Sequence, residues 1–455
     1  MAKTLPSILQ LKAEEVDTPE KRGKYTVGVI GCGLRGILYT EAFAEAGFKV
    51  ICADADQSLI KRLSKGNVKL ANYEETETKL KGYVRKGQLT ATSDLKTAAS
   101  KSDIIILTVS AKIDPKKNPD YSEVKNVCKQ IGAALPKGCL VVYGGVAGFG
   151  FVEGVVKETI ENTSGLKVRE DFCLAYNPLQ NPTAPVNRHI GDRELRVAAV
   201  DKSSLNSACL VFETIAKKGV KRISDMKIAE LTALFASARR DANLALTNEL
   251  AVFCENAGVD YMETLKLVDN YGCEMIDLPT IVEGNNRNEA YLLLESAENS
   301  NSKLRVTSLA RQVNEEMIKH AVNLTQNTLR SCGKTLRRAR IALLGAAIPE
   351  TAAEAFTEML AAKGAKITSY DPEGAEAGET GAHSVKKTLN ETVEGADCII
   401  ILIEQDQFKH LNFKKIRALM RPPVALIDLA GIIEPSKAES EGFAYRGFGR
   451  GVWKK

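Results

Sequence analysis

The hydrophobic pattern near the start of the chain alternates short apolar runs with longer helical periodicities. An apolar run at Val27–Ile30 precedes a helical pattern, and a second apolar run closes on Asp54. Further apolar runs at Ser102–Val109 and Cys139–Tyr143 also lie between helical patterns, whereas residues 65–93 are largely polar and charged. This alternation predicts an α/β domain built on a doubly wound parallel sheet.

The second half of the chain begins with long helical patterns and then returns to α/β alternation. One helix is predicted over Ile228–Ala257, ended by Gly258, and another over Val306–Leu329. A second α/β unit starts at Arg340, with a helix to Lys363 and strands at Lys366–Tyr370, Asp397–Ile403 and Val424–Asp428. We therefore predict an α/β fold with two doubly wound domains joined by a long central helix.

The turn after the first apolar run carries the glycine pattern Gly31-x-Gly33-x-x-Gly36. The first glycine permits a tight turn, the second lets backbone approach a pyrophosphate, and the third lets helix and strand pack closely, while the helix N-terminus attracts phosphate. Asp54 lies 54 − 31 = 23 residues after the first glycine, close to the roughly 20 at which a carboxylate meets a ribose 2′-hydroxyl. NAD is therefore the predicted cofactor, rather than NADP. The predicted cofactor-binding residues are Gly31, Cys32, Gly33, Leu34, Gly36 and Asp54.

Composition narrows the function classes. The 455 residues are 44% hydrophobic and 26% charged with a net charge of +5, which is typical of a multidomain globular protein and does not suggest nucleic-acid binding. The ten cysteines are scattered, as expected of buried thiols in a reducing compartment. Residues 1–24 lack a signal peptide pattern, and the apolar runs are too short to span a bilayer. We expect a cytoplasmic protein without membrane or nucleic-acid partners.

Three further features bear on possible sites. The glycine-rich run Gly144–Gly150 follows a strand, so its backbone is expected either to approach the nicotinamide end of a cofactor or to form a flexible loop. Arg240, Asp241 and Asn243 on the predicted central helix either line a site or fix that helix against its partner. The four histidines are dispersed, so no metal site is expected.

Several motifs together resemble the UDP-glucose/GDP-mannose dehydrogenase family, the nucleotide-sugar 6-dehydrogenases, and within it the UDP-N-acetylmannosamine dehydrogenases. The resemblance extends from Tyr25 to Trp453 and rests on the order and spacing of these motifs. They are the glycine pattern, Ala229-Glu230-Leu231, Arg240-Asp241-x-Asn243-x-Ala245-Leu246-x-Asn248-Glu249-Leu250-Ala251, Gly258-Val259-Asp260, Ala310-Arg311-x-x-Asn314, Tyr370-Asp371-Pro372 and Tyr445-Arg446-Gly447-Phe448-Gly449-Arg450.

The resemblance implies two Rossmann-type domains bridged by a long central helix that forms a homodimer interface, with NAD on the first domain and the UDP-sugar closed in by the last. The predicted boundaries are 1–24 for a charged N-terminal extension, 25–204 for the NAD-binding domain, 205–330 for the central helical dimerisation domain and 331–455 for the C-terminal Rossmann-like domain. The turn at Gly345 has a single glycine, so a second dinucleotide site of the same kind is not expected.

The family oxidises the sugar C6 alcohol twice, and each step needs particular groups. A cysteine attacks the aldehyde, so that the second hydride transfer gives a thioester, which water hydrolyses. A lysine and an asparagine on the central helix stabilise oxyanions and position water, and a carboxylate and a threonine assist proton transfer. An aspartate lies four residues beyond the cysteine.

This sequence departs from the family at those positions when it is counted without gaps from the matching segments. The nucleophile position becomes Asn285, the lysine Ala233, the asparagine Ser237 and the carboxylate Leu179, the threonine is replaced within Gly144–Ala147, and the nucleotide-sugar-binding Lys and Arg after Gly345 are missing from Ala346–Thr351. These departures predict that the thioester mechanism is absent.

Two residues are weaker catalytic candidates. Glu289 is a possible replacement for the final acid. Cys273 precedes Asp277 at the family's cysteine-to-aspartate spacing, but the gapless count puts the nucleophile position 285 − 273 = 12 residues later, so a half-buried thiol is the favoured interpretation.

Two functional classes therefore stay open. The protein is either an oxidoreductase that performs a single hydride transfer on a nucleotide sugar or other small alcohol, with Glu289 or an unidentified residue as base, or a non-catalytic NAD(H)-binding regulator or partner of an active homologue. The architecture also resembles β-hydroxyacid dehydrogenases, but the missing helix lysine argues against that chemistry.

Overall fold

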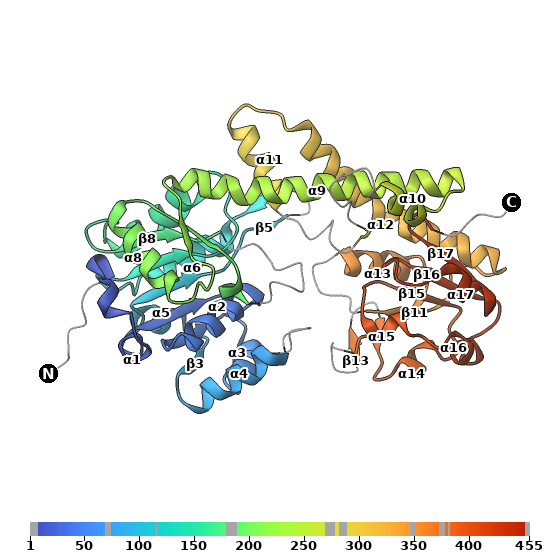
Figure 1. The fold of residues 1–455 in the computed structure, drawn as a ribbon, viewed down its shortest axis with the longest axis horizontal. Coiled ribbons are helices and arrows are strands. Elements are labelled where there is room, and N and C mark those ends of the chain that lie inside the picture. The colour runs from blue at the N-terminus through green and yellow to red at the C-terminus, as the bar shows by residue number, and fades with distance from the viewer. Residues whose placement is uncertain are drawn as a thin grey trace. The chain divides into compact units, whose positions relative to one another are not determined.

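The computed structural model describes residues 8–68, 74–114, 116–178, 189–268, 278–281, 289–345, 352–372, 378–380 and 383–450. The chain divides into two compact units, Met1–Ala236 with Tyr291–Ser302 and Ser237–Ala290 with Lys303–Lys455. Each unit contains one large sheet with helices packed against it (Figure 1). The predicted α/β class with two doubly wound sheets is confirmed.

The sheet of the first unit has eight strands in the order β10-β9-β8-β7-β4-β1-β2-β3. All neighbours are parallel except β8 and β9, which are antiparallel. The strands are β1 (Thr26–Ile30), β2 (Lys49–Ala53), β3 (Leu89–Thr92), β4 (Ile104–Leu107), β7 (Leu140–Tyr143), β8 (Cys173–Tyr176), β9 (Leu195–Ala199) and β10 (Val220–Arg222). A separate antiparallel pair is formed by β5 (Lys112–Ile113) and β6 (Pro119–Asp120).

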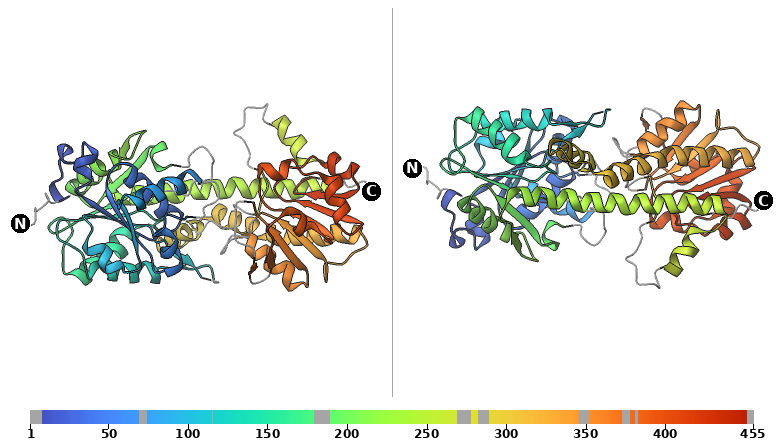
Figure 2. Two further views of the ribbon diagram at one scale, coloured as in Figure 1. Left: turned by 90° about the horizontal axis from the view of Figure 1, so that it is seen from below. Right: turned by 90° about the horizontal axis from the view of Figure 1, so that it is seen from above.

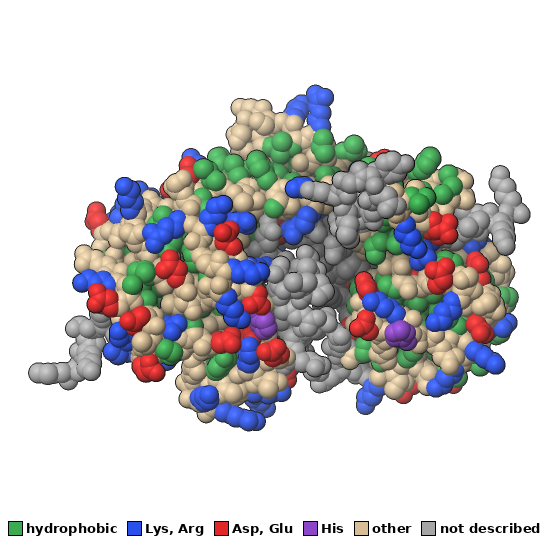
Figure 3. Space-filling model, in the orientation of Figure 1, with side chains coloured by type: hydrophobic (Ala, Val, Ile, Leu, Met, Phe, Trp, Pro, Cys, Tyr) green, Lys and Arg blue, Asp and Glu red, His purple; other side chains and the backbone are tan. Residues whose placement is uncertain are grey.

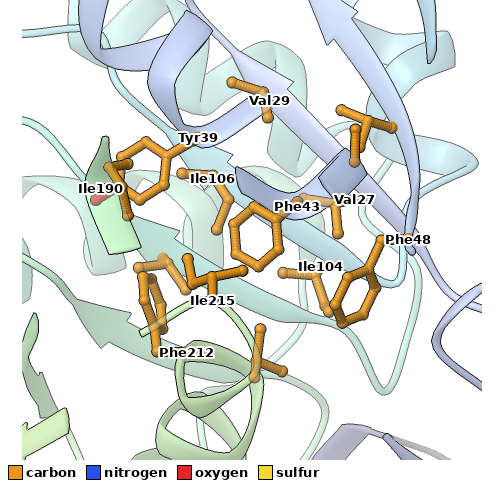
Figure 4. Close-up of a cluster of buried hydrophobic side chains, with 14 of the residues drawn as sticks. Val27, Val29, Tyr39, Phe43, Phe48, Ile104, Ile106, Ile190, Phe212 and Ile215 are labelled. Carbon is orange, nitrogen blue, oxygen red and sulfur yellow. The ribbon is translucent and has the colours of Figure 1, made fainter. Parts of the chain in front are cut away.

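Helices cover both faces of this sheet, and for this reason its central strands are apolar at nearly every position. On one face, strand side chains such as Val27, Ile104 and Ile106 pack against Phe43 and Phe212 (Figure 4). The first-unit helices are η1 (Ile8–Gln10), η2 (Ala13–Glu15), α1 (Pro19–Arg22), α2 (Leu34–Glu45), α3 (Gln57–Leu63), α4 (Glu74–Arg85), α5 (Leu95–Ser100), α6 (Ser122–Gly132), η3 (Val152–Lys157), α7 (Glu158–Ser164), η5 (Ile190–Asp192), α8 (Lys202–Glu213) and α11 (Glu289–Asn299), the last starting two residues before this unit's second segment.

The sheet of the second unit has seven strands in the order β13-β14-β12-β11-β15-β16-β17, parallel except for β13 and β14. They are β11 (Arg340–Leu344), β12 (Lys366–Tyr370), β13 (Gly378–Thr380), β14 (His383–Val385), β15 (Cys398–Ile401), β16 (Val424–Asp428) and β17 (Phe443–Gly447). Alternate residues of β15 point to opposite apolar clusters, Cys398 and Ile400 to one and Ile399 and Ile401 to the other. The sheet is therefore buried on both faces.

The helices of the second unit include a long one, α12 (Arg305–Ser331), which packs with α13 on one face of the sheet. The others are α10 (Tyr261–Val268), α13 (Ala352–Ala362), α14 (Leu389–Val393), α15 (Asp406–Lys409), α16 (Phe413–Leu419) and α17 (Pro435–Ser440).

The predicted central helix is α9 (Met226–Ala257), which is unbroken over its length (Figure 2). It is followed by Gly258 in the left-handed region with φ 71°, as predicted for a residue that ends a helix. The predicted second helix corresponds to α12. The boundary between the two units falls within α9, after Ala236.

Candidate dinucleotide site and the central helix

The glycine pattern forms the turn between β1 and α2, and its geometry explains two of the three glycines. Gly31 has φ 93°, a conformation that side chains rarely adopt. A Cβ at Gly36 would lie 1.9 Å from the carbonyl oxygen of Gly31, so only glycine allows this approach of helix to strand. These observations match the predicted tight turn and close packing.

Gly33 differs from the other two glycines because it faces open space. It is exposed, and a Cβ placed on it would meet no atom within 4 Å. Gly33 is also the N-cap residue of α2 and supplies no side-chain cap to that helix. Open space over backbone N–H groups at a helix N-terminus fits a diphosphate.

Asp54 lies at the carboxyl end of β2 and is tied to the glycine turn. Its Oδ2 accepts the backbone N–H of Cys32 at 2.7 Å, and its Oδ1 accepts that of Asp56 at 3.0 Å. Leu34, the first residue of α2, is half-buried beside this turn. The residues present therefore fit a dinucleotide whose adenosine ribose lies at Asp54. The individual contacts of these residues with the cofactor stay predictions.

Sequence reasoning missed two residues that contact the turn from the segment after the neighbouring strand β4. Thr108 donates from Oγ1 to the carbonyl oxygen of Gly31 at 2.7 Å. Ser110 accepts a hydrogen bond from Arg35 Nη1 at 2.9 Å. Arg35 lies inside the glycine pattern, so the sequence could have indicated it as a residue of this turn. Its partner Ser110 is 75 residues away, and nothing in the sequence indicated that contact.

The first five residues of the glycine-rich run after β7 are packed rather than exposed. Gly144 to Gly148 are buried, and a Cβ at Gly144 would lie 2.9 Å from the ring of Tyr39. A Cβ at Gly145 would lie 2.7 Å from the Tyr143 hydroxyl. Glycine is therefore required here by tyrosine packing. The approach of this backbone to a nicotinamide stays a prediction.

Glu230 anchors the first part of α9 to the chain that follows this run. Its two carboxylate oxygens accept the backbone N–H groups of Gly150 at 2.6 Å and Val152 at 2.9 Å. Burial raises the pKa of Glu230 to about 7, and the two N–H donors oppose that shift. This acid therefore has a structural position at the N-terminus of η3.

Motif residues of α9 and α12 meet in a buried polar network. Asp241 Oδ1 pairs with Arg311 Nη1 at 2.6 Å, and the Asn314 amide donates to the Asp241 carbonyl and carboxylate at 2.9 Å. Asn248 donates to Asn314 at 3.0 Å. Asn243 is exposed. For Asp241, these contacts favour the predicted role of fixing the central helix.

The catalytic candidates are only partly described. Ala233 and Ser237 are buried on α9 with 4% and 2% exposure, and Glu289 is the half-buried first residue of α11. Cys273, Asp277, Asn285, Leu179 and residues 346–351 lie outside the described residues.

Histidine contacts, cysteines and helix lengths can be stated for the described residues. His320 pairs with Glu255 at 2.9 Å and His189 with Glu41 at 3.3 Å, and no group of three metal-binding side chains occurs among the residues that the structure covers. All nine cysteines in those ranges are buried free thiols. Over the same part of the chain, every helix is too short or too polar to cross a membrane.

Comparisons with known proteins match both the N-terminal and the C-terminal part of the chain to one family. Residues 25–187 match the NAD-binding domain of the UDP-glucose/GDP-mannose dehydrogenase family, and residues 347–435 match the UDP-binding domain of that family. The UDP-N-acetyl-D-mannosamine dehydrogenase of Pyrococcus horikoshii is 26% identical over 434 residues, covering 93% of this chain and 99% of the relative.

Solved structures agree over the same length. The UDP-D-ManNAc dehydrogenase structure from Pyrococcus horikoshii has a TM-score of 0.80 at 25% identity, with 94% of this chain and 100% of that one covered. An NDP-N-acetyl-D-galactosaminuronic acid dehydrogenase from Methanosarcina mazei Go1 has a TM-score of 0.71 at 26% identity, with 96% and 98% covered. NAD is the cofactor of the first domain, and this chain belongs to the UDP-glucose/GDP-mannose dehydrogenase family.

Proposed function

We propose that this protein is an NAD-dependent oxidoreductase for the alcohol group of a nucleotide sugar, in which the four-electron oxidation to a uronic acid is lost or altered. The relatives named above act on UDP-N-acetylmannosamine and related nucleotide sugars, so this substrate class is the first to test. The observation that carries the altered chemistry is the pair Ala233 and Ser237 on α9.

The register of these two positions is supported from both sides. Glu230 is held by Gly150 and Val152, and Asp241 is held by Arg311 and Asn314. Between these anchors α9 has no break, which supports counting the two positions without a gap. The small side chains at 233 and 237 leave no amine or amide to stabilise an oxyanion there.

The remaining groups allow one hydride transfer more readily than two. NAD supplies the acceptor for a hydride from the alcohol carbon. The alcohol proton needs a base, and Glu289 at the start of α11 is the candidate within the described chain. A second oxidation through a thioester requires a thiolate, and the aligned position holds Asn285.

A second candidate function is a non-catalytic NAD(H)-binding partner or regulator, and the surface of α9 favours association. Five exposed apolar side chains recur on one face of this helix at intervals of whole turns. They are Ile228, Phe235, Leu246, Leu250 and Phe253. Figure 3 shows hydrophobic side chains gathered along α9. We propose that this stripe joins two copies, or one copy and a homologue, because large exposed apolar patches mark interfaces.

The test combines cofactor binding with turnover. Purified protein is titrated with NAD by calorimetry and then assayed for NADH formation with UDP-N-acetylmannosamine, UDP-N-acetylglucosamine, UDP-glucose and simple alcohols. NADH formation that Glu289→Gln abolishes while NAD affinity is kept supports the oxidoreductase, and NAD binding without turnover supports the regulator. Turnover lost in Cys273→Ser would instead identify a displaced nucleophile and overturn the proposal.

A further inference from the structure

The glycine pattern contains a positively charged residue, Arg35, which the turn does not need for its conformation. Arg35 is the second residue of α2, and its Nη1 donates to Ser110 Oγ at 2.9 Å. Ser110 follows β4, which neighbours β1 on the side opposite to β2. The guanidinium therefore reaches across the carboxyl edge of β1 toward β4, away from Asp54.

The surroundings of this cation are partly desolvated. Arg35 is half-buried and Tyr143 is fully buried. Burial raises the pKa values of Tyr39 and Tyr143, and the positive charge of Arg35 opposes both shifts. A Cβ at Gly145 would lie 3.1 Å from Ser110 Oγ and 2.7 Å from the Tyr143 hydroxyl. Arg35 therefore lies close to Ser110, Gly145 and the side chains of Tyr39 and Tyr143, a group of residues that we call the Arg35 corner.

The orientation of the bound dinucleotide determines which part of it lies near the Arg35 corner. With the adenosine ribose at Asp54 and the diphosphate at the N-terminus of α2, the second nucleotide continues toward the other half of the sheet, where β4 and β7 end. We infer that Arg35 is a specificity-determining residue that disfavours the pyridinium charge of NAD⁺ and so makes this site prefer NADH. The inference rests on the NAD site of the first unit and not on any catalytic residue.

The two cofactor forms separate this effect from general phosphate attraction. NAD⁺ and NADH share the adenosine and the diphosphate, so attraction of Arg35 to phosphate strengthens both equally. They differ by one positive charge on the nicotinamide ring, and repulsion from a neighbouring guanidinium acts on the oxidised form alone. A unit charge in a partly buried site changes the ratio of dissociation constants by about five- to tenfold. A tenfold ratio raises the potential of the bound couple by about 30 mV.

The experiment measures dissociation constants of NAD⁺, NADH and ADP-ribose for the wild type, Arg35→Gln, Arg35→Met and Arg35→Lys by calorimetry. We expect the neutral variants to lower the Kd(NAD⁺)/Kd(NADH) ratio about five- to tenfold and Arg35→Lys to keep most of it. An exposed α6 lysine changed in Lys129→Gln is the matched control and should leave the ratio unchanged. In the wild type, raising the ionic strength should also lower the Kd(NAD⁺)/Kd(NADH) ratio, because salt screens the repulsion. This measurement does not depend on the folding of any variant.

Two results would overturn the inference. If the neutral variants weaken NAD⁺, NADH and ADP-ribose by the same factor, Arg35 contacts the diphosphate alone. If the ratio is insensitive to both substitution and salt, the guanidinium has no influence on the ring. Failure of the wild type to bind any of the three ligands is a different outcome, because it would remove the NAD site itself.

Discussion

At the scale of single residues, the cofactor turn shows why three glycines with the same pattern are not equivalent. Gly31 is required by its backbone conformation and Gly36 by its contact with the Gly31 carbonyl. Gly33 is surrounded by open space on the protein side. Substitutions at Gly33 and Gly36 should therefore separate cofactor affinity from stability.

We predict that Gly36→Ala destabilises the protein by about 1–3 kcal/mol, because the added methyl group overpacks the turn. Gly33→Ala should change stability by less than about 1 kcal/mol, the range of glycine-to-alanine changes at an N-cap, yet weaken NAD binding by about tenfold or more. Chemical denaturation and calorimetric NAD titration measure both quantities. Unchanged NAD affinity in Gly33→Ala would contradict the placement of the diphosphate over this residue.

Glu230 gives a prediction about pH. Its pKa is about 7 in the folded protein because of burial, against 4.5 as the ordinary value. The folded state therefore binds more protons than the unfolded state between these values, and stability from this group is full below about pH 4.5 and is lost as pH rises to about 7. The loss amounts to about 3 kcal/mol.

The check is the free energy of unfolding of the wild type and Glu230→Gln from pH 4.5 to 8. The wild type should lose stability relative to Glu230→Gln as pH rises, because glutamine does not titrate. A constant difference between the two proteins across this range would show that Glu230 is ionised throughout.

At the scale of elements, the sequence predicted many of the buried strands but missed β8, although all four of its residues are buried. The predicted strands Val424–Asp428 and Lys366–Tyr370 agree with β16 and β12 at both ends. For β16 the reason is its apolar run Val424–Ile427, which has clear limits. The edge strand β3 was not predicted, since Leu89–Thr92 is short and only Leu89 is buried. Asp397 was placed in a strand but precedes β15, where it accepts the Arg340 N–H at 2.8 Å.

The candidate site was predictable only where its residues are neighbours in sequence. The glycine pattern and Asp54 belong to one strand–helix–strand unit, so spacing was sufficient to find them. The partners of Arg35 and Asp241 lie 75 and 70 residues away. Spacing along the chain carries no signal for such a pair, and the role of Asp241 consequently stayed open until its contact with Arg311 was seen.

The link between α9 and α12 provides the prediction at this scale. Asp241 is fully buried and Arg311 is 3% exposed, so Asp241→Asn leaves a buried guanidinium without its nearest carboxylate and should destabilise the protein by about 3 kcal/mol. Asp241→Asn combined with Arg311→Met should recover part of that loss. The exposed Asn243→Ala is the control. Arg311→Met alone completes the double-mutant cycle. Urea denaturation measures all five proteins, and a loss in the double variant equal to the sum of the two single losses would contradict a direct pair.

At the scale of the whole molecule, the chain is two α/β units that share helical segments. The predicted central region 205–330 is divided between them, with residues up to Ala236 and Tyr291–Ser302 in the first unit and the remainder in the second. Helices of this region have apolar faces to bury, and each α/β unit offers a sheet face for that purpose. The apolar stripe on α9 (Ile228, Phe235, Leu246, Leu250 and Phe253) stays exposed after this packing.

We predict that the stripe mediates self-association. Phe253 and Leu246 are 65% and 51% exposed, and Leu246→Asp with Phe253→Asp should convert a dimer to a monomer by placing like charges in an apolar interface. Sedimentation equilibrium gives the mass of each protein, with Lys129→Glu on the exposed face of α6 as the control. A wild type that is monomeric at micromolar concentration would contradict the predicted homodimer.

We propose that this protein keeps its cofactor site but has lost the groups for thioester chemistry. The most direct measurement is the mass spectrum of the nucleotide-sugar products after incubation with NAD and UDP-N-acetylmannosamine or UDP-glucose, with NADH counted in the same sample. We predict that NAD binds and that no uronic acid forms. A uronic acid accompanied by two NADH for each sugar consumed would contradict this prediction.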